Sequence, residues 1–137
     1  MKKVLVLCTG NSCRSQMAEG FLHNHGVDVK SAGLESHGLN PYAVQVMREV
    51  NIDISTNISR KIDTLNLSSF DILITVCDHA RDTCPNIPDI KTNIHKSFRD
   101  PAIFNGSEQE KLLIYRHVRD QINVFCQQLI RQDYNLI

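Results

Sequence analysis

Short apolar runs alternate with amphipathic stretches along the 137 residues of this chain. Residues 4–8 are apolar, and valines alternate with charged residues at the start of a second extended segment, 27–33. Residues 72–76 are apolar throughout, which is typical of a strand covered on both faces, whereas residues 92–96 are a weaker candidate. The pattern predicts four strands.

The segments between these strands show helical periodicity. Residues 15–25 place apolar side chains on one face, and Asn40-Pro41 supplies a cap and a first-turn proline for a second helix that runs to residue 50. Residues 59–67 predict a weaker, short helix. Residues 107–110 form a capping box that begins a long C-terminal helix.

Strands that alternate with helices indicate one α/β domain, residues 1–137, in which helices flank a parallel sheet in three layers. For four strands we expect the order 2-1-3-4. The first and third strands are then neighbours at the topological switch point, where ligands usually bind. Their carboxyl ends carry Cys8 and Cys77.

Composition narrows the classes of function. The chain has 15 basic and 15 acidic residues, so no net charge attracts nucleic acid or a membrane surface. No apolar stretch approaches the length of a membrane span, and the first residues lead into a strand and not a secretory segment, so we expect a cytoplasmic monomer. Five cysteines are an odd number for a disulfide framework, which leaves metal binding or redox or nucleophilic chemistry.

A small polar loop joins the first strand to the first helix, between Cys8 and Arg14. Loop amides and a helix N-terminus together bind a tetrahedral oxyanion, and the same field favours thiolate over thiol at Cys8. Arg14 adds a planar two-pronged donor. We interpret Cys8 as a nucleophile and expect a positive φ at Asn11. The expected anion-binding residues are Thr9, Gly10, Asn11, Ser12, Cys13, Arg14 and Ser15.

Two further cysteines follow the third strand. Neighbouring strands lie about 4.8 Å apart, so the predicted strand order brings Cys77 within disulfide reach of Cys8. Cys84 is seven residues further on, about 10.5 Å along a helix, so a Cys77–Cys84 bridge requires that helix to unwind. Pro85 favours a short element of low stability. A zinc site that uses Cys77, His79 and Cys84 is the alternative, although no fourth ligand completes it.

Residues 8–20 resemble the anion loop and first helix of low-molecular-weight tyrosine phosphatases and thioredoxin-coupled arsenate reductases. Four further features, in order along nearly the whole chain, are similar to the arsenate reductase branch: Ser31-Ala32-Gly33, His37-Gly38-x-Asn40-Pro41, the Cys77 and Cys84 pair, and Asp100-Pro101. The resemblance implies a low-molecular-weight phosphatase-like fold and an arsenate reductase without a cofactor or metal. It also implies weak phosphatase activity.

The resemblance also implies a mechanism. Cys8 attacks arsenate held by the loop amides and Arg14, and Asp100 protonates the leaving oxygen. Cys77 then attacks the Cys8–arsenic adduct, which releases arsenite. Cys84 takes over the disulfide, and reduced thioredoxin opens it. Each step is an exchange between a thiolate and a suitable leaving group.

Several expectations accompany this interpretation. Ser15 is expected to hydrogen-bond the sulfur of Cys8. Some family members bind potassium through residues matching Asn11, Glu19 and Ser31 and through an acidic residue near position 60. This chain has Arg60-Lys61 at that place. Our hypothesis is that a side-chain cation replaces the potassium ion and pairs with Glu19. The sequence predicts that Cys13 is structural within the loop and that Cys126 packs on the apolar face of the last helix. Arg119 and Asp120 are expected to be solvated charges on this helix, and the six histidines to be solvated or otherwise satisfied.

Two other functions remain open. A phosphatase acting on phosphotyrosine or a small phosphate ester needs Cys8, Arg14 and Asp100 but not Cys77. A redox sensor or anion-responsive binding module would use Cys77 and Cys84 only to switch a surface. Phosphate and arsenate have the same shape and charge, so the sequence does not indicate which of the two oxyanions the protein selects.

Overall fold

The computed structural model describes residues 1–83, 87 and 90–137. Four parallel strands form one sheet in the order β2-β1-β3-β4, which confirms the predicted order. The strands are β1 (Lys3–Cys8), β2 (Asp28–Gly33), β3 (Ile72–Thr75) and β4 (Thr92–His95). Residues 4–7 of the central strand β1 have no exposed surface, as expected for a strand covered on both faces.

The register of the sheet places the two cysteines at one edge. Cys8, the last residue of β1, pairs with Gly33 of β2, and Leu7 pairs with Thr75 of β3. The amide of Val76 donates to the carbonyl of Leu7, so the chain that leaves β3 stays beside β1 up to Cys77. The carboxyl edge of the sheet therefore carries both thiols, as the strand order predicts.

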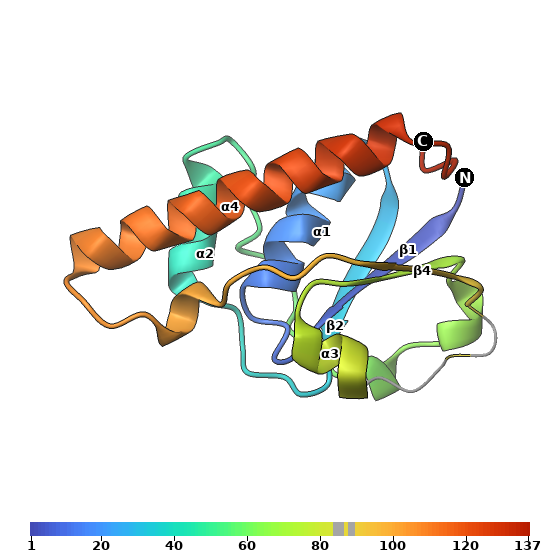
Figure 1. The fold of residues 1–137 in the computed structure, drawn as a ribbon, viewed down its shortest axis with the longest axis horizontal. Coiled ribbons are helices and arrows are strands. Elements are labelled where there is room, and N and C mark those ends of the chain that lie inside the picture. Colours follow the sequence, from blue (N-terminus) through green and yellow to red (C-terminus); the bar gives the residue numbers. More distant parts are fainter. Residues whose placement is uncertain (84–86, 88–89) are drawn as a thin grey trace.

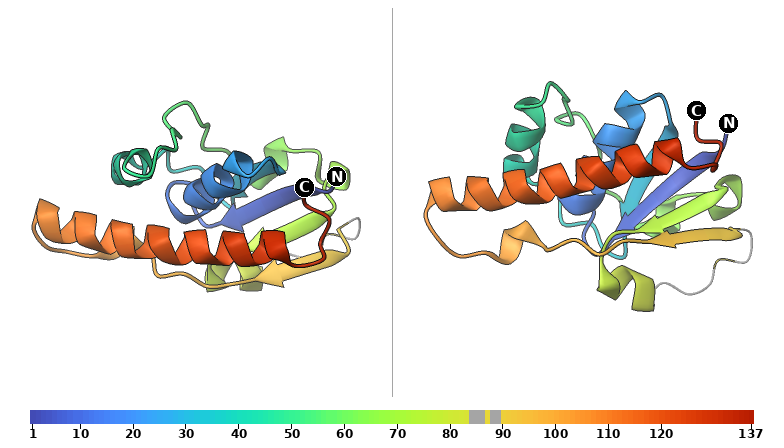
Figure 2. Two further views of the ribbon diagram at one scale, coloured as in Figure 1. Left: turned by 90° about the horizontal axis from the view of Figure 1, so that it is seen from above. Right: turned by 45° about the horizontal axis from the view of Figure 1, so that its top comes forward.

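The described residues also form four α-helices: α1 (Arg14–Asn24), α2 (Pro41–Arg48), α3 (Asp78–Thr83) and α4 (Glu108–Arg131). α1 contacts β1, β2 and α4, and α4 also contacts α2 (Figures 1 and 2). The predicted caps are confirmed, because the Asn40 side chain accepts from the first turn of α2 and residues 107–110 form the capping box of α4. α3 and the segment 62–69 lie on the opposite side of the strands from α1 and α4 (Figure 1), which completes the three layers.

The predicted helix over residues 59–67 is wrong. This segment holds only two single turns of 3₁₀ helix, at Ile62–Thr64 and Leu67–Ser69. One cause is that the Arg60 carbonyl accepts from the Gly33 amide and Lys61 bridges Gly33 in parallel, so residues 60–61 extend the sheet at the end of β2. A second is that the hydroxyls of residues 68 and 69 bond back to Asn66, which competes with helical hydrogen bonding.

Arg119 of α4 is buried, and the expectation that it is solvated is wrong. Its Nη1 donates to the carbonyl of Val46 at 2.9 Å and to Glu49 Oε1 at 2.9 Å. Because α2 ends at Arg48, the Val46 carbonyl lacks a partner within its own helix, and Arg119 supplies one. Asp120 is exposed, as predicted.

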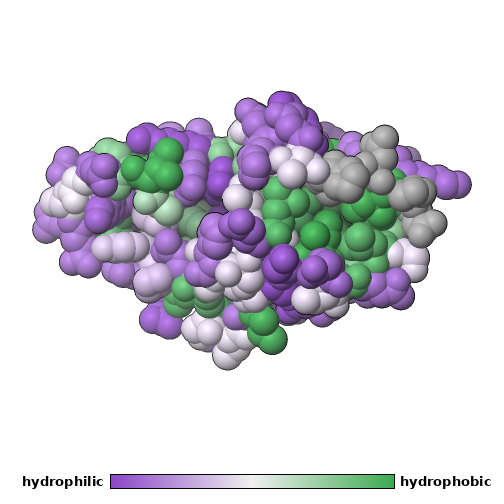
Figure 3. Space-filling view, turned by 90° about the horizontal axis from the view of Figure 1, so that it is seen from below, coloured by the Kyte–Doolittle hydropathy of each residue, from purple (hydrophilic) through white to green (hydrophobic). Residues whose placement is uncertain are grey.

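Seen from below, hydrophobic residues gather on part of the surface and hydrophilic ones surround much of it (Figure 3). Within the described residues, no helix is both long and apolar enough to cross a membrane.

Cys126 is fully buried, and burial raises the pKa of its thiol to about 12. The expectation that Cys126 is a packing residue is confirmed.

Candidate active site

The loop between β1 and α1 borders a cavity of about 190 Å³ at the carboxyl edge of the sheet. Predicted catalytic and anion-binding residues line this cavity together with two residues from other segments. The lining comprises Cys8, Thr9, Gly10, Ser12, Cys13, Arg14, His37, Asp100 and Ala102. The structure therefore brings Cys8, Arg14 and Asp100 to one site although Asp100 is distant in sequence.

The segment after β2 fixes the backbone of this loop. Four of its amides donate to four carbonyls of residues 8–12, so the two segments run side by side. The pairs are Leu34 N to Cys8 O at 3.2 Å, Glu35 N to Thr9 O at 2.8 Å, His37 N to Gly10 O at 2.9 Å and Asn40 N to Ser12 O at 3.0 Å.

The loop amides, in contrast, are unused. Within the described residues, no backbone N–H from Thr9 to Cys13 donates a hydrogen bond to a protein atom. Cys13 is the N-cap of α1, and its side chain makes no capping hydrogen bond. Unpaired N–H groups in a partly buried loop at a helix N-terminus are the donors that bind an oxyanion.

Asn11 holds the loop in shape from the inside. Its φ of 48° confirms the expected left-handed conformation, and the side chain is fully buried. Nδ2 donates to the hydroxyls of Ser15 at 2.9 Å and Ser31 at 2.8 Å. Oδ1 accepts from Gln16 Nε2 at 3.1 Å and from the Arg60 amide at 2.9 Å. This role of Gln16 was not predicted, because its other partners, Asn57 and Ile58, lie far along the chain.

The predicted contact between Ser15 and Cys8 is present. Ser15 Oγ lies 2.8 Å from Cys8 Sγ, and both residues are buried. Ser15 Oγ already accepts a hydrogen bond from Asn11 Nδ2, so its own hydrogen is free to point at the sulfur. The contact fixes the position of the Cys8 sulfur against the first turn of α1.

Arg14 and Asp100 face each other across the cavity. Arg14 Nη2 is 3.6 Å from Asp100 Oδ2, and Nη1 donates to the carbonyl of Phe98 at 3.1 Å. Asp100 also accepts from the amide of Ala102 at 3.0 Å, where it caps a 3₁₀ turn over Pro101–Ile103. Both charged groups are therefore held in place before a substrate arrives.

Cys13 remains a thiol in this site. Burial, followed by the negative charges of Asp100 and Cys8, raises its pKa well above the ordinary value. Burial and then the proximity of Cys13 raise the pKa of Tyr115 to about 12. The phenol of Tyr115 accepts from the Asn40 side chain at 2.9 Å.

Cys77 lies at the beginning of α3, where its sulfur meets two donors. The hydroxyl of Thr9 is 3.5 Å from Cys77 Sγ, and the amide of Ala80 donates to the same sulfur at 3.4 Å. Cys8, Cys13, Cys77 and Cys126 are free thiols. Cys84, the third cysteine of the expected relay and a ligand of the alternative zinc site, lies outside the described residues.

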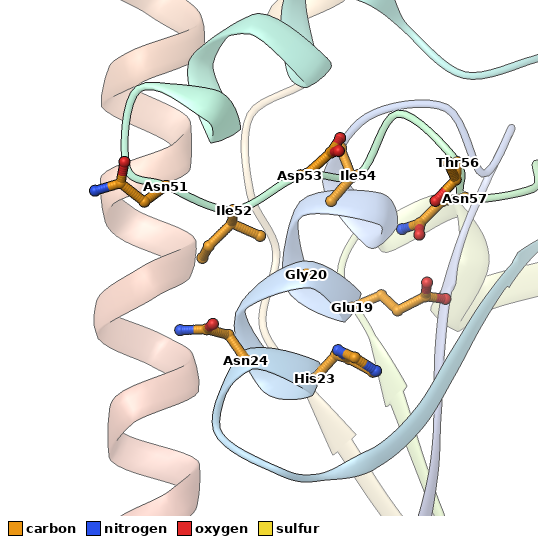
Figure 4. Close-up of a pocket in the computed structure, with 10 residues that line it drawn as sticks. All are labelled: Glu19, Gly20, His23, Asn24, Asn51, Ile52, Asp53, Ile54, Thr56 and Asn57. Carbon is orange, nitrogen blue, oxygen red and sulfur yellow. The ribbon is translucent and has the colours of Figure 1, made fainter.

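A second pocket borders the far side of α1, between that helix and residues 51–57 (Figure 4). Glu19 lines it, and its Oε1 accepts from the amide of Ser31 at 2.6 Å. The hypothesis that Arg60 or Lys61 pairs with Glu19 is wrong: among the described residues Glu19 has no ion pair within 4.0 Å, and Lys61 Nζ lies 3.9 Å from Asp63.

A potassium ion does not fit the matching residues either. Asn11 Oδ1 would be a ligand, but two N–H donors already occupy it, from Gln16 and from the Arg60 backbone. An arginine at position 60 replaces the acidic ligand that the family pattern requires. In the part of the chain that the structure describes, no group of three or more His, Cys, Asp or Glu side chains is arranged to hold a metal.

The sheet order, the anion loop and the facing Cys8, Arg14 and Asp100 define a phosphatase-like site of the kind that the sequence resemblance indicates. The family profile of low molecular weight phosphotyrosine protein phosphatases matches residues 3–135. The chain belongs to this family.

Within this family, the chain is similar to proteins named arsenate reductase. The arsenate reductase of Bacillus licheniformis is 50% identical over 124 residues, which cover 88% of this chain and 89% of that protein. The arsenate reductase of Bacillus subtilis is 48% identical over the same shares of each chain. A solved structure described as an arsenate reductase in the phosphate binding state superposes with a TM-score of 0.77 at 36% identity, and covers 95% of this chain and 97% of its own.

Proposed function

We propose that this protein reduces arsenate to arsenite, with Cys8 as nucleophile and with thiols as the source of electrons. The observation that carries the proposal is the contact between Thr9 and Cys77, which places a second thiol beside the anion loop. A hydrolytic phosphatase needs Cys8, Arg14 and Asp100 but has no use for Cys77. The names of the relatives support the same reaction.

The first step is substitution at arsenic. The unpaired amides of residues 9–13 and the guanidinium of Arg14 hold the oxyanion, and the Cys8 thiolate forms a bond to arsenic. One arsenate hydroxyl leaves as water after it receives a proton from Asp100, which lines the same cavity. The product is a covalent Cys8–arsenic(V) ester.

The second step is the reduction. The Cys77 thiolate attacks the sulfur of Cys8, and a sulfur–sulfur bond forms while the sulfur–arsenic bond breaks. The electron pair of the broken bond stays on arsenic, which becomes arsenic(III) and leaves as arsenite. The contacts of Cys77 Sγ with the Thr9 hydroxyl and the Ala80 amide support this step, because they hold the sulfur beside the loop that follows Cys8.

The remaining steps regenerate the enzyme. Cys84 attacks Cys77, displaces the Cys8 thiolate and leaves a Cys77–Cys84 disulfide. Reduced thioredoxin, as in the reducing cytoplasm, then reduces that disulfide by two electrons. The position of Cys77 at the beginning of the six-residue helix α3 supports this handover, since an isolated helix so short has little stability of its own.

The test is arsenate-dependent consumption of NADPH with thioredoxin and thioredoxin reductase. The expected result is turnover, and the same assay with glutaredoxin and glutathione identifies the electron donor. Disulfide formation with an oxidant but no arsenate-dependent turnover of thiols would overturn the proposal in favour of a redox sensor.

The Cys77→Ser variant discriminates reductase from phosphatase. We expect it to lose arsenate reduction and to keep hydrolysis of p-nitrophenyl phosphate. A Cys84→Ser variant is expected to stop after one arsenite, with a Cys8–Cys77 bridge detectable by mass spectrometry. If Cys77→Ser keeps arsenate reduction, Cys77 takes no part in the reaction and the proposed relay is wrong; a wild-type protein that hydrolyses p-nitrophenyl phosphate but does not reduce arsenate would support the phosphatase assignment.

A further inference from the structure

His37 forms part of the wall of the anion cavity, although it lies outside the loop. Its ring packs directly on Gly10: a Cβ built at residue 10 would lie 2.3 Å from Nδ1 of His37. The amide of His37 donates to the Gly10 carbonyl at 2.9 Å, which fixes the backbone that carries the ring. The absence of a side chain at residue 10 is thus what allows the imidazole to approach the loop.

The neighbouring carboxylate fixes the orientation of the ring. Glu35 Oε2 lies 2.6 Å from Nε2 of His37, so Nε2 carries a hydrogen and Nδ1 is turned to the anion loop. The two side chains are 54% and 67% exposed, and an ion pair so exposed contributes little to the stability of the fold. The contact therefore orients the imidazole and adds little to stability.

The charges around the cavity favour a second cation. Besides His37, the ionisable groups that line the cavity are Cys8, Asp100 and Arg14, together with Cys13, whose thiol stays neutral. Arg14 is also shared with Asp100. Among the residues that line the cavity, Arg14 is therefore the one fixed cation, and it is already paired with Asp100 before a doubly charged oxyanion enters.

We propose that His37 is a direct ligand of the oxyanion, taking up one proton as the dianion binds and donating Nδ1–H to an anion oxygen. Glu35 holds the opposite nitrogen and so acts as a positioning residue. The proton comes from solvent and returns to it when the anion leaves. The proposal rests on the proposed function, because it concerns the oxyanion that Cys8 attacks.

The experiment is titration calorimetry with inorganic phosphate, which thiols do not reduce, in two buffers of different ionisation enthalpy. We expect His37→Gln to bind phosphate roughly 3- to 10-fold more weakly and to take up fewer protons than the wild type. Glu35→Gln should reduce proton uptake less. His117→Gln, an exposed histidine on α4, is the matched control and should match the wild type.

A purely structural role of His37 predicts a different result. If the ring only covers Gly10, His37→Gln changes the affinity equally from pH 6 to pH 9 and leaves proton uptake unchanged, which would overturn the inference. Equal affinity of wild type and His37→Gln would overturn it as well. If the wild type fails to bind phosphate at all, the proposed active site itself is wrong, and that outcome is distinct from the other two.

Discussion

The hydroxyl of Thr9 lies 3.5 Å from the sulfur of Cys77, although 68 positions separate the two residues in sequence. Thr9 directly follows Cys8, the proposed nucleophile, and Cys77 follows the neighbouring strand β3. This contact links the residues proposed for the two chemical steps. It exists because parallel strands end at the same edge of a sheet, and β1 and β3 are neighbours there.

Thr9→Val removes this hydroxyl and keeps the shape of the side chain. One hydrogen bond contributes about 1 kcal/mol, so we expect arsenite release to slow about fivefold. Hydrolysis of p-nitrophenyl phosphate does not use Cys77 and should stay within about twofold of the wild type. Rapid-quench measurement of arsenite separates the two steps, and an equal loss in both activities would contradict the assignment.

Ser15→Ala removes the hydroxyl that lies 2.8 Å from Cys8 Sγ. Hydrogen bonds to charged groups contribute about 1.5–3 kcal/mol, which predicts a loss of roughly 10- to 100-fold in the rate of attack by Cys8. Both the reductase and the phosphatase activity should fall, since Cys8 begins both reactions. Ser36→Ala is the control, because Ser36 is an exposed serine whose hydroxyl bonds to residue 59 and not to the thiol. Unchanged kinetics in Ser15→Ala would exclude the proposed role.

Alkylation by iodoacetamide at pH 7 should distinguish the buried thiols by their ionisation. Burial raises the pKa of Cys13 and of Cys126, so both stay protonated below pH 9 and react slowly. Cys8 is expected to react first, and phosphate to protect it. Peptide mapping by mass spectrometry gives the order, and unfolding in urea should abolish the differences. Modification of Cys13 as fast as Cys8 in the folded protein would disprove this pattern.

Arg119→Met tests the buried arginine that joins α4 to the end of α2. The variant leaves the Val46 carbonyl without a partner and Glu49 with one cation fewer, so we expect a loss of about 2–3 kcal/mol in the free energy of unfolding. The control is Arg116→Met, which removes the other cation of Glu49 from a more exposed position and should cost at most about 1 kcal/mol. Urea unfolding measures both, and equal losses would argue against the structural role of Arg119.

The sequence was sufficient for the sheet and for the anion loop because their signals are local. The apolar run before Cys8, the caps at Asn40 and Ser107 and the spacing from Cys8 to Arg14 each depend on neighbouring residues. Arg119, in contrast, is buried only because α4 crosses α2 at a carbonyl without a partner. The crossing of the two helices depends on tertiary packing, and no periodic pattern in the sequence indicates it.

The predicted helix at 59–67 failed for a related reason. A β-bridge from Lys61 to Gly33 and the bond from the Gly33 amide to the Arg60 carbonyl recruit this segment to the sheet. Local helix propensity is weak and tertiary hydrogen bonds override it. The predicted pairing of Arg60 or Lys61 with Glu19 failed likewise, since the path of the backbone past Asn11 decides which side chains meet.

Gly33 tests how closely the two backbones must approach at the active site. A Cβ at this position would lie 2.3 Å from the carbonyl of Glu35, 2.7 Å from the amide of Asn11 and 2.7 Å from the carbonyl of Thr9. These are backbone atoms of the anion loop and its supporting segment, so they move only if the loop is distorted. We therefore expect Gly33→Ala to weaken phosphate binding more than about tenfold and to lower stability by about 2 kcal/mol.

The matched control for this substitution is Gly106→Ala. Its added Cβ would lie 2.8 Å from Cε1 of Phe104, the end of a partly exposed side chain that is able to rotate away. Phosphate affinity of this variant should equal that of the wild type, with a stability change below about 1 kcal/mol. Calorimetry and thermal unfolding measure both quantities. Normal phosphate binding by Gly33→Ala would show that the loop tolerates displacement. The hydrogen bonds from the segment after β2 to the loop would then not be what fixes the anion site.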